Sequence, residues 1–374
     1  MNLDHALDKS HVIPVETSDD APLPDGNDVY ESLHEIQNNG FEITIRELLH
    51  AIGSKTAALP SSSKDDCLRA SLLYTYILDL DSPHLSFRAN YDSDLQTPRS
   101  QEIGIGMTCL LASRCFNVPW DQLGSLPGPG LRFDYRGKIN GFDGIFESKG
   151  TAHRGNQRAQ IRHGIEKKEA HHGRGDRFDV ELIISTFIGR NGQPPRIVVA
   201  DPDFDDLAKI YDRADNRFFR LRHYTRVLQF IGMPRTAFAL YKYSQERFKG
   251  VSGGGIDLSR AVMEERLTDG MLTTESFDNQ QYYGRWFDNV VEQGSKRYKK
   301  SMYDDSYLRE LSGLGRHRVF QGVREDVYRA GIEGEPFTHD LLSPDEIRVS
   351  LGRIGRPASL FSDGTIQIFE HSSA

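Results

Sequence analysis

The stretch LRFDYRGKINGFDGIFESK, residues Leu131 to Lys149, decides the fold of the middle of this chain. Asn140-Gly141 lies near its centre. An Asn-Gly pair is the strongest short signal for a two-residue hairpin turn, because both central residues of a type I′ turn need positive φ. The sequence therefore predicts a β-hairpin with one strand on each side of this turn.

The turn fixes which residues of the two strands face each other. It pairs Lys138 with Asp143 and Asp134 with Glu147. Because side chains alternate along a strand, the two faces of the hairpin then differ sharply in chemistry. We expect a core face of Phe133, Tyr135, Ile139, Phe142 and Phe146. The opposite face carries Arg132, Asp134, Arg136, Lys138, Asp143, Glu147 and Lys149, with Ile145 as its one apolar residue.

Asp134 and Glu147 form an acidic pair that a purely structural hairpin would avoid. Residues directly opposite have Cβ atoms about 4.5–5.5 Å apart, and like charges at that distance destabilise a sheet. A hard divalent cation between the two carboxylates resolves the repulsion. Lys149 lies two residues after Glu147 on the same face, beside such an ion. Asp143 lies roughly 13 Å along the strand from Glu147, too far to share the ion, and its partner Lys138 explains it.

This pattern resembles the PD-(D/E)XK nuclease superfamily, whose members include restriction endonucleases and Holliday-junction resolvases. The resemblance rests on Asp134, a gap of about a dozen residues across a β-turn, and Glu147-Ser148-Lys149 at the end of an apolar strand. Phe133 stands where the motif has its proline. The similarity covers about residues 98–201, so it implies a restriction-endonuclease-like α/β core with a mixed central sheet flanked by helices.

The resemblance implies hydrolysis of a phosphodiester bond with Mg²⁺, or Mn²⁺ in its place. Asp134, Glu147 and the backbone carbonyl of Ser148 would be the metal ligands, and Lys149 would orient or deprotonate the attacking water. Two further candidates are Glu102, early in the preceding helix, and Gln160, in the helix after the hairpin. The macrodipole favours a Glu early in a helix anyway, so Glu102 has an equally good structural explanation.

Basic residues cluster around this region although the net charge of the chain is −8. A local basic surface on an acidic protein fits a nucleic-acid site, with DNA favoured over RNA, whereas solvated charge-rich helices are the simpler reading. The candidates for phosphate contacts are Arg154 and Arg158 after the hairpin, and Arg213, Arg217 and Arg220 further on.

The remaining sequence divides into regions of different character. Residues 1–27 mix Pro, Asp and polar residues and predict a disordered acidic tail. Thr97-Pro98 predicts the start of a helix that ends near Phe116 and buries apolar side chains. Asp363-Gly364 predicts a terminal hairpin. The expected regions are a helical one at 28–96, the nuclease core at 97–204, a basic helical extension at 205–250 and a mixed region at 251–374.

Composition excludes several classes of protein. Three cysteines at this spacing cannot build a disulfide framework or a common zinc site, which favours a reducing compartment and a cytoplasmic protein. The sequence contains no apolar run of membrane-spanning length, so we expect no membrane partner.

The sequence thus predicts a metal-dependent nuclease, and analogy favours a role in restriction or anti-phage defence. Two alternatives stay open, a nuclease fold retained as a non-catalytic DNA-binding or assembly module, and an RNA nuclease. The flanking helices would supply substrate binding, regulation or the contacts of a homo-oligomer.

Overall fold

The computed structural model describes most of the chain. The described residues are 6–19, 21–23, 30–56, 74, 77–88, 93–126, 133–139, 142–173, 178–190, 192–201, 216–248, 257–277, 279–288, 316–333, 348–351, 357–361 and 363–372.

A mixed six-stranded sheet with the order β2-β8-β7-β6-β5-β4 forms the first half of the molecule. β6 runs parallel to β7, β2 runs parallel to β8, and the other neighbours are antiparallel. The expected α/β class with a mixed central sheet is therefore confirmed. The strand bounds are β2 Val15–Thr17, β4 Gly124–Ser125, β5 Tyr135–Ile139, β6 Phe142–Thr151, β7 Val180–Phe187 and β8 Arg196–Ala200.

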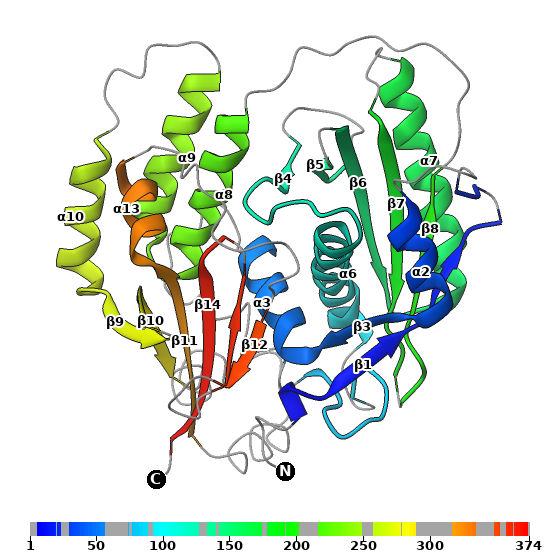
Figure 1. The fold of residues 1–374 in the computed structure, drawn as a ribbon, viewed down its shortest axis with the longest axis horizontal. Coiled ribbons are helices and arrows are strands. Elements are labelled where there is room, and N and C mark those ends of the chain that lie inside the picture. The colour runs from blue at the N-terminus through cyan, green and yellow to red at the C-terminus, as the bar shows by residue number, and fades with distance from the viewer. Residues whose placement is uncertain are drawn as a thin grey trace.

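Helices cover both faces of this sheet (Figure 1). α6, Ser93–Cys115, packs on one face, where Phe146 joins the main core. α7, Gln157–Gly173, follows the short helix η2, Arg154–Asn156, and packs on the other face, where Ile145 and Ile161 belong to a separate core cluster. β7 is buried along its whole length because it has a helix on each side.

The hairpin of β5 and β6 has the register that its sequence predicts. Tyr135 pairs with Phe146, and the pairing continues to Ile139 with Phe142. The Asn140-Gly141 turn itself lies outside the described residues. One face assignment is wrong. Phe133 packs with Ile145 on the α7 side, because it precedes β5 and the alternation of the strand does not extend to it.

The helix before the hairpin begins earlier than expected. α6 starts at Ser93 and not at Thr97-Pro98, so Pro98 lies inside it with an exposed side chain. There it removes one backbone hydrogen bond and keeps its ring in solvent. The expected end near Phe116 is confirmed, since α6 ends at Cys115. The expected buried face is confirmed too, since Ile103, Met107, Leu110 and Leu111 are fully buried.

The prediction of a disordered tail at residues 1–27 is wrong for its central part. β1, Ser10–Ile13, pairs with β3, Phe41–Thr44, and β2 extends the main sheet beside β8. The proline and acidic residues of this segment are typical of disorder. The apolar residues around Pro14 nevertheless suit short strands at a sheet edge. Two helices complete this part, α2 at Glu31–Asn39 and α3 at Ile45–Thr56.

An antiparallel sheet with the order β12-β13-β14-β11-β10-β9 forms the second half. The hairpin predicted at Asp363-Gly364 is confirmed, since Leu360 pairs with Ile366 across it. The strands are β9 Thr273–Phe277, β10 Gln280–Asp288, β11 Arg316–Arg324, β12 Arg348–Leu351, β13 Pro357–Leu360 and β14 Thr365–Ser372. Its helices are α8 Asn216–Phe230, α9 Pro234–Phe248, α10 Leu258–Asp269 and α13 Glu325–Glu333.

Buried polar side chains join the two halves. His50 of α3 bonds to the hydroxyls of Ser359 and Thr365, at 3.0 and 2.8 Å. His223 of α8 bonds to Asp363 at 2.8 Å, and its other ring nitrogen lies 3.4 Å from Lys55 Nζ. Burial lowers the pKa of each histidine to about 4, so both are neutral at pH 7.

Candidate active site

The acidic pair lies at the end of β6 that β5 does not cover. Asp134 stands one residue before β5, and its Oδ2 accepts a hydrogen bond from the backbone N–H of Ser148 at 3.0 Å. Glu147 is fully buried in β6. Lys167 Nζ lies 2.5 Å from Glu147 Oε1 and 3.7 Å from Asp134 Oδ1. The two carboxylates are therefore on the same side of the sheet and within reach of one cation.

Lysines offset the charge of this pair. Lys149 Nζ and Lys167 Nζ each lie 2.5 Å from Glu147 Oε1. The second oxygen of that carboxylate, Oε2, is buried and has no hydrogen-bond partner among the described residues, and neither has Ser148 Oγ. Burial, with a smaller effect from Asp134, raises the pKa of Glu147, while the two lysines oppose that rise.

The oxygen donors suit a hard divalent ion. N–H and C=O of one residue in a strand point to the same side, so the Ser148 carbonyl faces the side on which its N–H meets Asp134. Two carboxylates and a carbonyl are ligands that Mg²⁺ accepts, with water completing its shell. Among the described residues, neither this site nor any other gathers three His, Cys, Asp or Glu side chains, so the carbonyl and water would have to complete the shell here. The orphaned Glu147 Oε2 is a buried acceptor that such an ion would satisfy.

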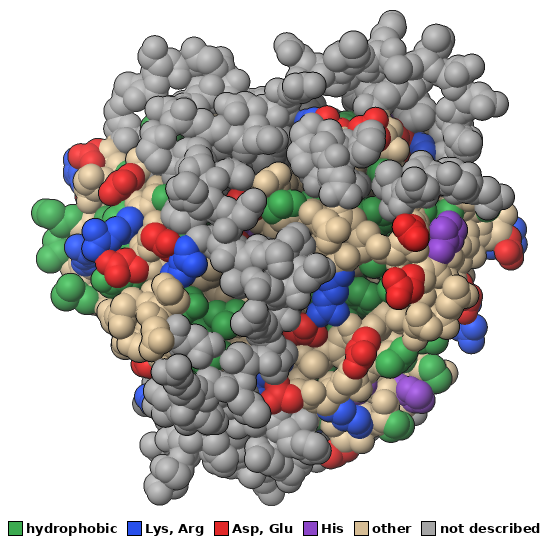
Figure 2. Space-filling model, viewed as in Figure 1, with side chains coloured by type: hydrophobic (Ala, Val, Ile, Leu, Met, Phe, Trp, Pro, Cys, Tyr) green, Lys and Arg blue, Asp and Glu red, His purple; other side chains and the backbone are tan. Residues whose placement is uncertain are grey.

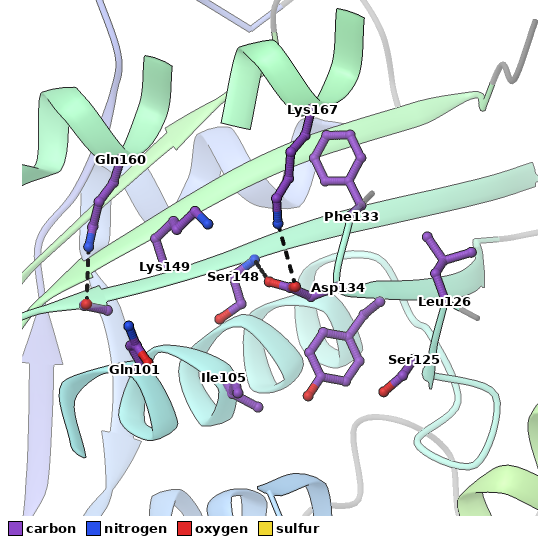
Figure 3. Close-up of a pocket in the computed structure, with 12 residues that line it drawn as sticks. Gln101, Ile105, Ser125, Leu126, Phe133, Asp134, Ser148, Lys149, Gln160 and Lys167 are labelled. Carbon is purple, nitrogen blue, oxygen red and sulfur yellow. Dashed lines mark hydrogen bonds and ion pairs between the residues drawn. The ribbon is translucent and has the colours of Figure 1, made fainter. Parts of the chain in front are cut away.

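A pocket of about 560 Å³ opens beside this pair (Figure 3). Asp134, Ser148, Lys149 and Lys167 supply one part of its wall, and Gln160 lies along the same side. The remaining lining residues are Gln101, Ile105, Ser125, Leu126, Phe133, Tyr135 and Gly150. The pocket thus joins a charged end to an apolar and aromatic wall, as ligand sites commonly do.

Two glycines set the position of α6 against the pocket. A Cβ on Gly150 would lie 1.7 Å from the Ser100 carbonyl oxygen, and one on Gly104 would lie 2.7 Å from that of Lys149. Only glycine allows this close approach of helix and strand. The contact turns Gln101 and Ile105 toward the pocket.

Glu102 does not reach the acidic pair, contrary to its expected role. It accepts hydrogen bonds from Tyr74 Oη and from Arg99 Nη1, the latter at 2.7 Å, and it is absent from the pocket wall. The predicted turn of the helix does face the pocket. The residue that faces it is Gln101 and not Glu102.

The two glutamines of α7 serve different purposes. Gln157 is buried, donates to the Ser185 carbonyl at 2.9 Å and accepts from Arg196, so it holds the helix to the sheet. Gln160 lines the pocket and donates to the Gly150 carbonyl at 3.1 Å (Figure 3). The structure therefore places Gln160, but not Gln157, beside the candidate metal ligands.

The basic residues are only partly described. Arg154 and Arg158 are exposed around α7, four residues apart, and Arg162 continues the same row. Arg213 lies outside the described residues, and for Arg217 and Arg220 only the backbone of α8 is described. On the face shown in Figure 2, Lys and Arg side chains are interspersed with Asp and Glu.

The run of arginines in α8 ends in packing contacts. The guanidinium of Arg222 stacks on the ring of Tyr241 at 4.2 Å. Arg226 donates to the Lys55 carbonyl and to Ser125 Oγ, at the pocket wall. Arg222 therefore holds α8 to α9, and Arg226 ties α8 to the first half of the molecule.

Sequence reasoning missed two residues of the site. Lys167 follows Gln160 by seven residues, two turns of α7, so the same helix face carries both, and this spacing could have revealed it. His171 at the end of α7 accepts a hydrogen bond from the backbone N–H of Phe133 at 3.0 Å. It thereby fixes the chain just before Asp134, which no local pattern indicates.

Comparison with known proteins adds no relative. No family model matches the chain, and no curated protein or solved structure does. Among the described helices, none is both long and apolar enough to cross a bilayer.

Proposed function

We propose that this protein is a divalent-metal-dependent nuclease that hydrolyses phosphodiester bonds, with DNA as the favoured substrate. The observation that carries the proposal is the geometry of Asp134 and Glu147. The two acidic side chains lie on one side of the sheet beside a pocket, Lys167 contacts both, and Glu147 Oε2 has no hydrogen-bond partner among the described residues.

Asp134, Glu147 and the Ser148 carbonyl would hold the ion, which is Mg²⁺, or Mn²⁺ in its place. When bound, such an ion would polarise the phosphoryl group and make an attacking water more acidic. The raised pKa of Glu147 fits this assignment, because a buried carboxylate gains most from a nearby dication.

The other residues of the pocket have roles that follow from their positions. Lys149 would place a positive charge next to the scissile phosphate and orient the attacking water. Gln160 holds the Gly150 carbonyl and thereby fixes the strand that carries Lys149. Arg154 in η2 and Arg158 in α7 are exposed and would contact the phosphates of the nucleic-acid backbone and position the substrate.

The order of elements also supports a restriction-endonuclease-like core. α6 precedes the β4-β5-β6 strands, α7 links β6 to the parallel strand β7, and β8 follows. A helix, a hairpin, a second helix and two strands in this order fit the proposed core. A role in restriction or anti-phage defence and a cytoplasmic location extend the proposal by analogy.

Cleavage of plasmid DNA tests the proposal directly. Wild type should degrade the DNA with Mg²⁺ or Mn²⁺ and leave it intact in chelator. Glu147→Gln and Lys149→Ala should each lose at least about 100-fold in rate. Glu166→Gln is the matched control, because Glu166 is exposed on α7, pairs with His163 and does not line the pocket.

Three outcomes would contradict the proposal in different ways. If wild type and both variants cut at the same rate, the site is misassigned. If wild type retards DNA in a gel without metal and never cuts it, the protein is a binding module. If only RNA is cut in a substrate panel, the chemistry stands and the substrate is wrong.

A further inference from the structure

Lys167 occupies the position that a divalent ion would need. Its Nζ lies between the two carboxylates, 2.5 Å from Glu147 Oε1 and 3.7 Å from Asp134 Oδ1. Figure 3 shows the side chain descending from α7 toward Asp134. An ammonium and a metal ion cannot both sit there, because their charges repel and they compete for the same oxygens.

The two lysines of the site are not equivalent. Lys149 lies on the same strand as Glu147 and forms an ion pair with that residue. Lys167 comes from the facing helix and reaches both carboxylates. Its flexible four-carbon stem enters a pocket of about 560 Å³, which leaves room for the ammonium to move.

The neighbouring lysine provides an internal comparison. Lys168 also bridges two carboxylates, at 2.6 Å from Asp201 and 3.4 Å from Glu181. There the second oxygens are bonded, since Tyr30 Oη donates to Asp201 and the Phe178 N–H donates to Glu181. That cluster is closed and complete. At Lys167, Glu147 Oε2 has no partner among the described residues, so this cluster lacks one cation or donor.

We propose that Lys167 is a displaceable counter-ion, which neutralises Asp134 and Glu147 in the metal-free protein and yields its place to the divalent ion. Its released ammonium stays at the pocket wall and contacts the phosphate of the substrate. This inference rests on the proposed function, and it assigns a second phosphate-contacting lysine to the site.

Binding of Mn²⁺ alone, measured by titration calorimetry, tests the displacement without any substrate. Lys167→Met removes the competing charge and should bind Mn²⁺ about ten-fold more tightly than wild type. Lys167→Arg keeps a cation and should bind no more tightly than wild type, which separates charge from folding defects. Arg162→Met is the control, because it removes the same charge from an exposed position of α7. Its affinity should stay within about two-fold of wild type.

Cleavage at saturating Mn²⁺ tests the second step. Lys167→Met should cut about 10- to 100-fold more slowly than wild type although it binds the ion more tightly. An ion pair with a purely structural role would not separate these two readouts.

The inference is overturned if Lys167→Met binds Mn²⁺ as wild type does or more weakly, or if it cuts at the wild-type rate. Failure of the proposed function looks different, because wild type itself would then leave every nucleic acid intact.

Discussion

Acidification should unfold this protein through two histidines buried where its halves meet. His50 and His223 have pKa values of about 4 in the folded state, mainly because burial disfavours their charged forms. In the unfolded chain both titrate near 6.5. At a pH between these pKa values, the two histidines are protonated in the unfolded chain and neutral in the folded protein. The stabilisation is complete above about pH 6.5 and is lost as the pH falls toward 4.

The magnitude follows from the number of protons and not from the size of the shifts. Each histidine changes the free energy of unfolding by about 1.4 kcal/mol per pH unit, so the pair gives about 2.7 kcal/mol per unit near pH 5. Glu147 acts in the opposite direction, because its raised pKa lets the folded state take up a proton first. Single variants isolate the histidine contribution from this background.

Urea unfolding between pH 7 and pH 5, followed by tryptophan fluorescence, measures the slope. His50→Gln and His223→Gln should each reduce it by about 1.4 kcal/mol per pH unit near pH 5. His163→Gln, at an exposed position of α7, should leave it unchanged. Variants at positions 50 and 223 that kept the wild-type slope would refute the reasoning.

Three further perturbations test the packing and the surface of the site. Gly150→Ala should lower the free energy of unfolding by about 1–3 kcal/mol or more. Gly155→Ala is the control, because Gly155 has open space around it, and it should leave thermal denaturation nearly unchanged. Gln157→Ala should cost about 1–3 kcal/mol of stability by leaving buried partners unpaired, and a denaturant midpoint as in wild type would contradict its structural role. Removing Arg154 and Arg158 together should reduce the salt dependence of DNA binding by about one unit of log–log slope per lost phosphate contact, and an unchanged slope would exclude them.

The hairpin could be predicted because its signals are local. The Asn140-Gly141 pair and the alternation of side chains fix the register within a few residues, and the structure has that register at Tyr135 and Phe146. The placement of Asp134 and Glu147 on one side followed from that register. The sequence could also predict which turn of α6 faces the site.

Which side of each helix meets the sheet could not be predicted, because tertiary packing decides it. The contact of Gly104 and Gly150 rotates α6 so that Gln101 and not Glu102 faces the pocket. Lys167 was missed for the same reason, since its role depends on how α7 lies over β6. The short edge strand β2 was not predicted, because it is stabilised by pairing with β8, which is far away in the sequence.

The most direct measurement is anomalous diffraction from crystals soaked in Mn²⁺. We expect a peak within about 2.0–2.6 Å of carboxylate oxygens of both Asp134 and Glu147, with Lys167 Nζ moved away from them. A Mn²⁺ ion bound elsewhere, or a Lys167 ammonium that stays between the two carboxylates at saturating Mn²⁺, would contradict the proposed metal-dependent site.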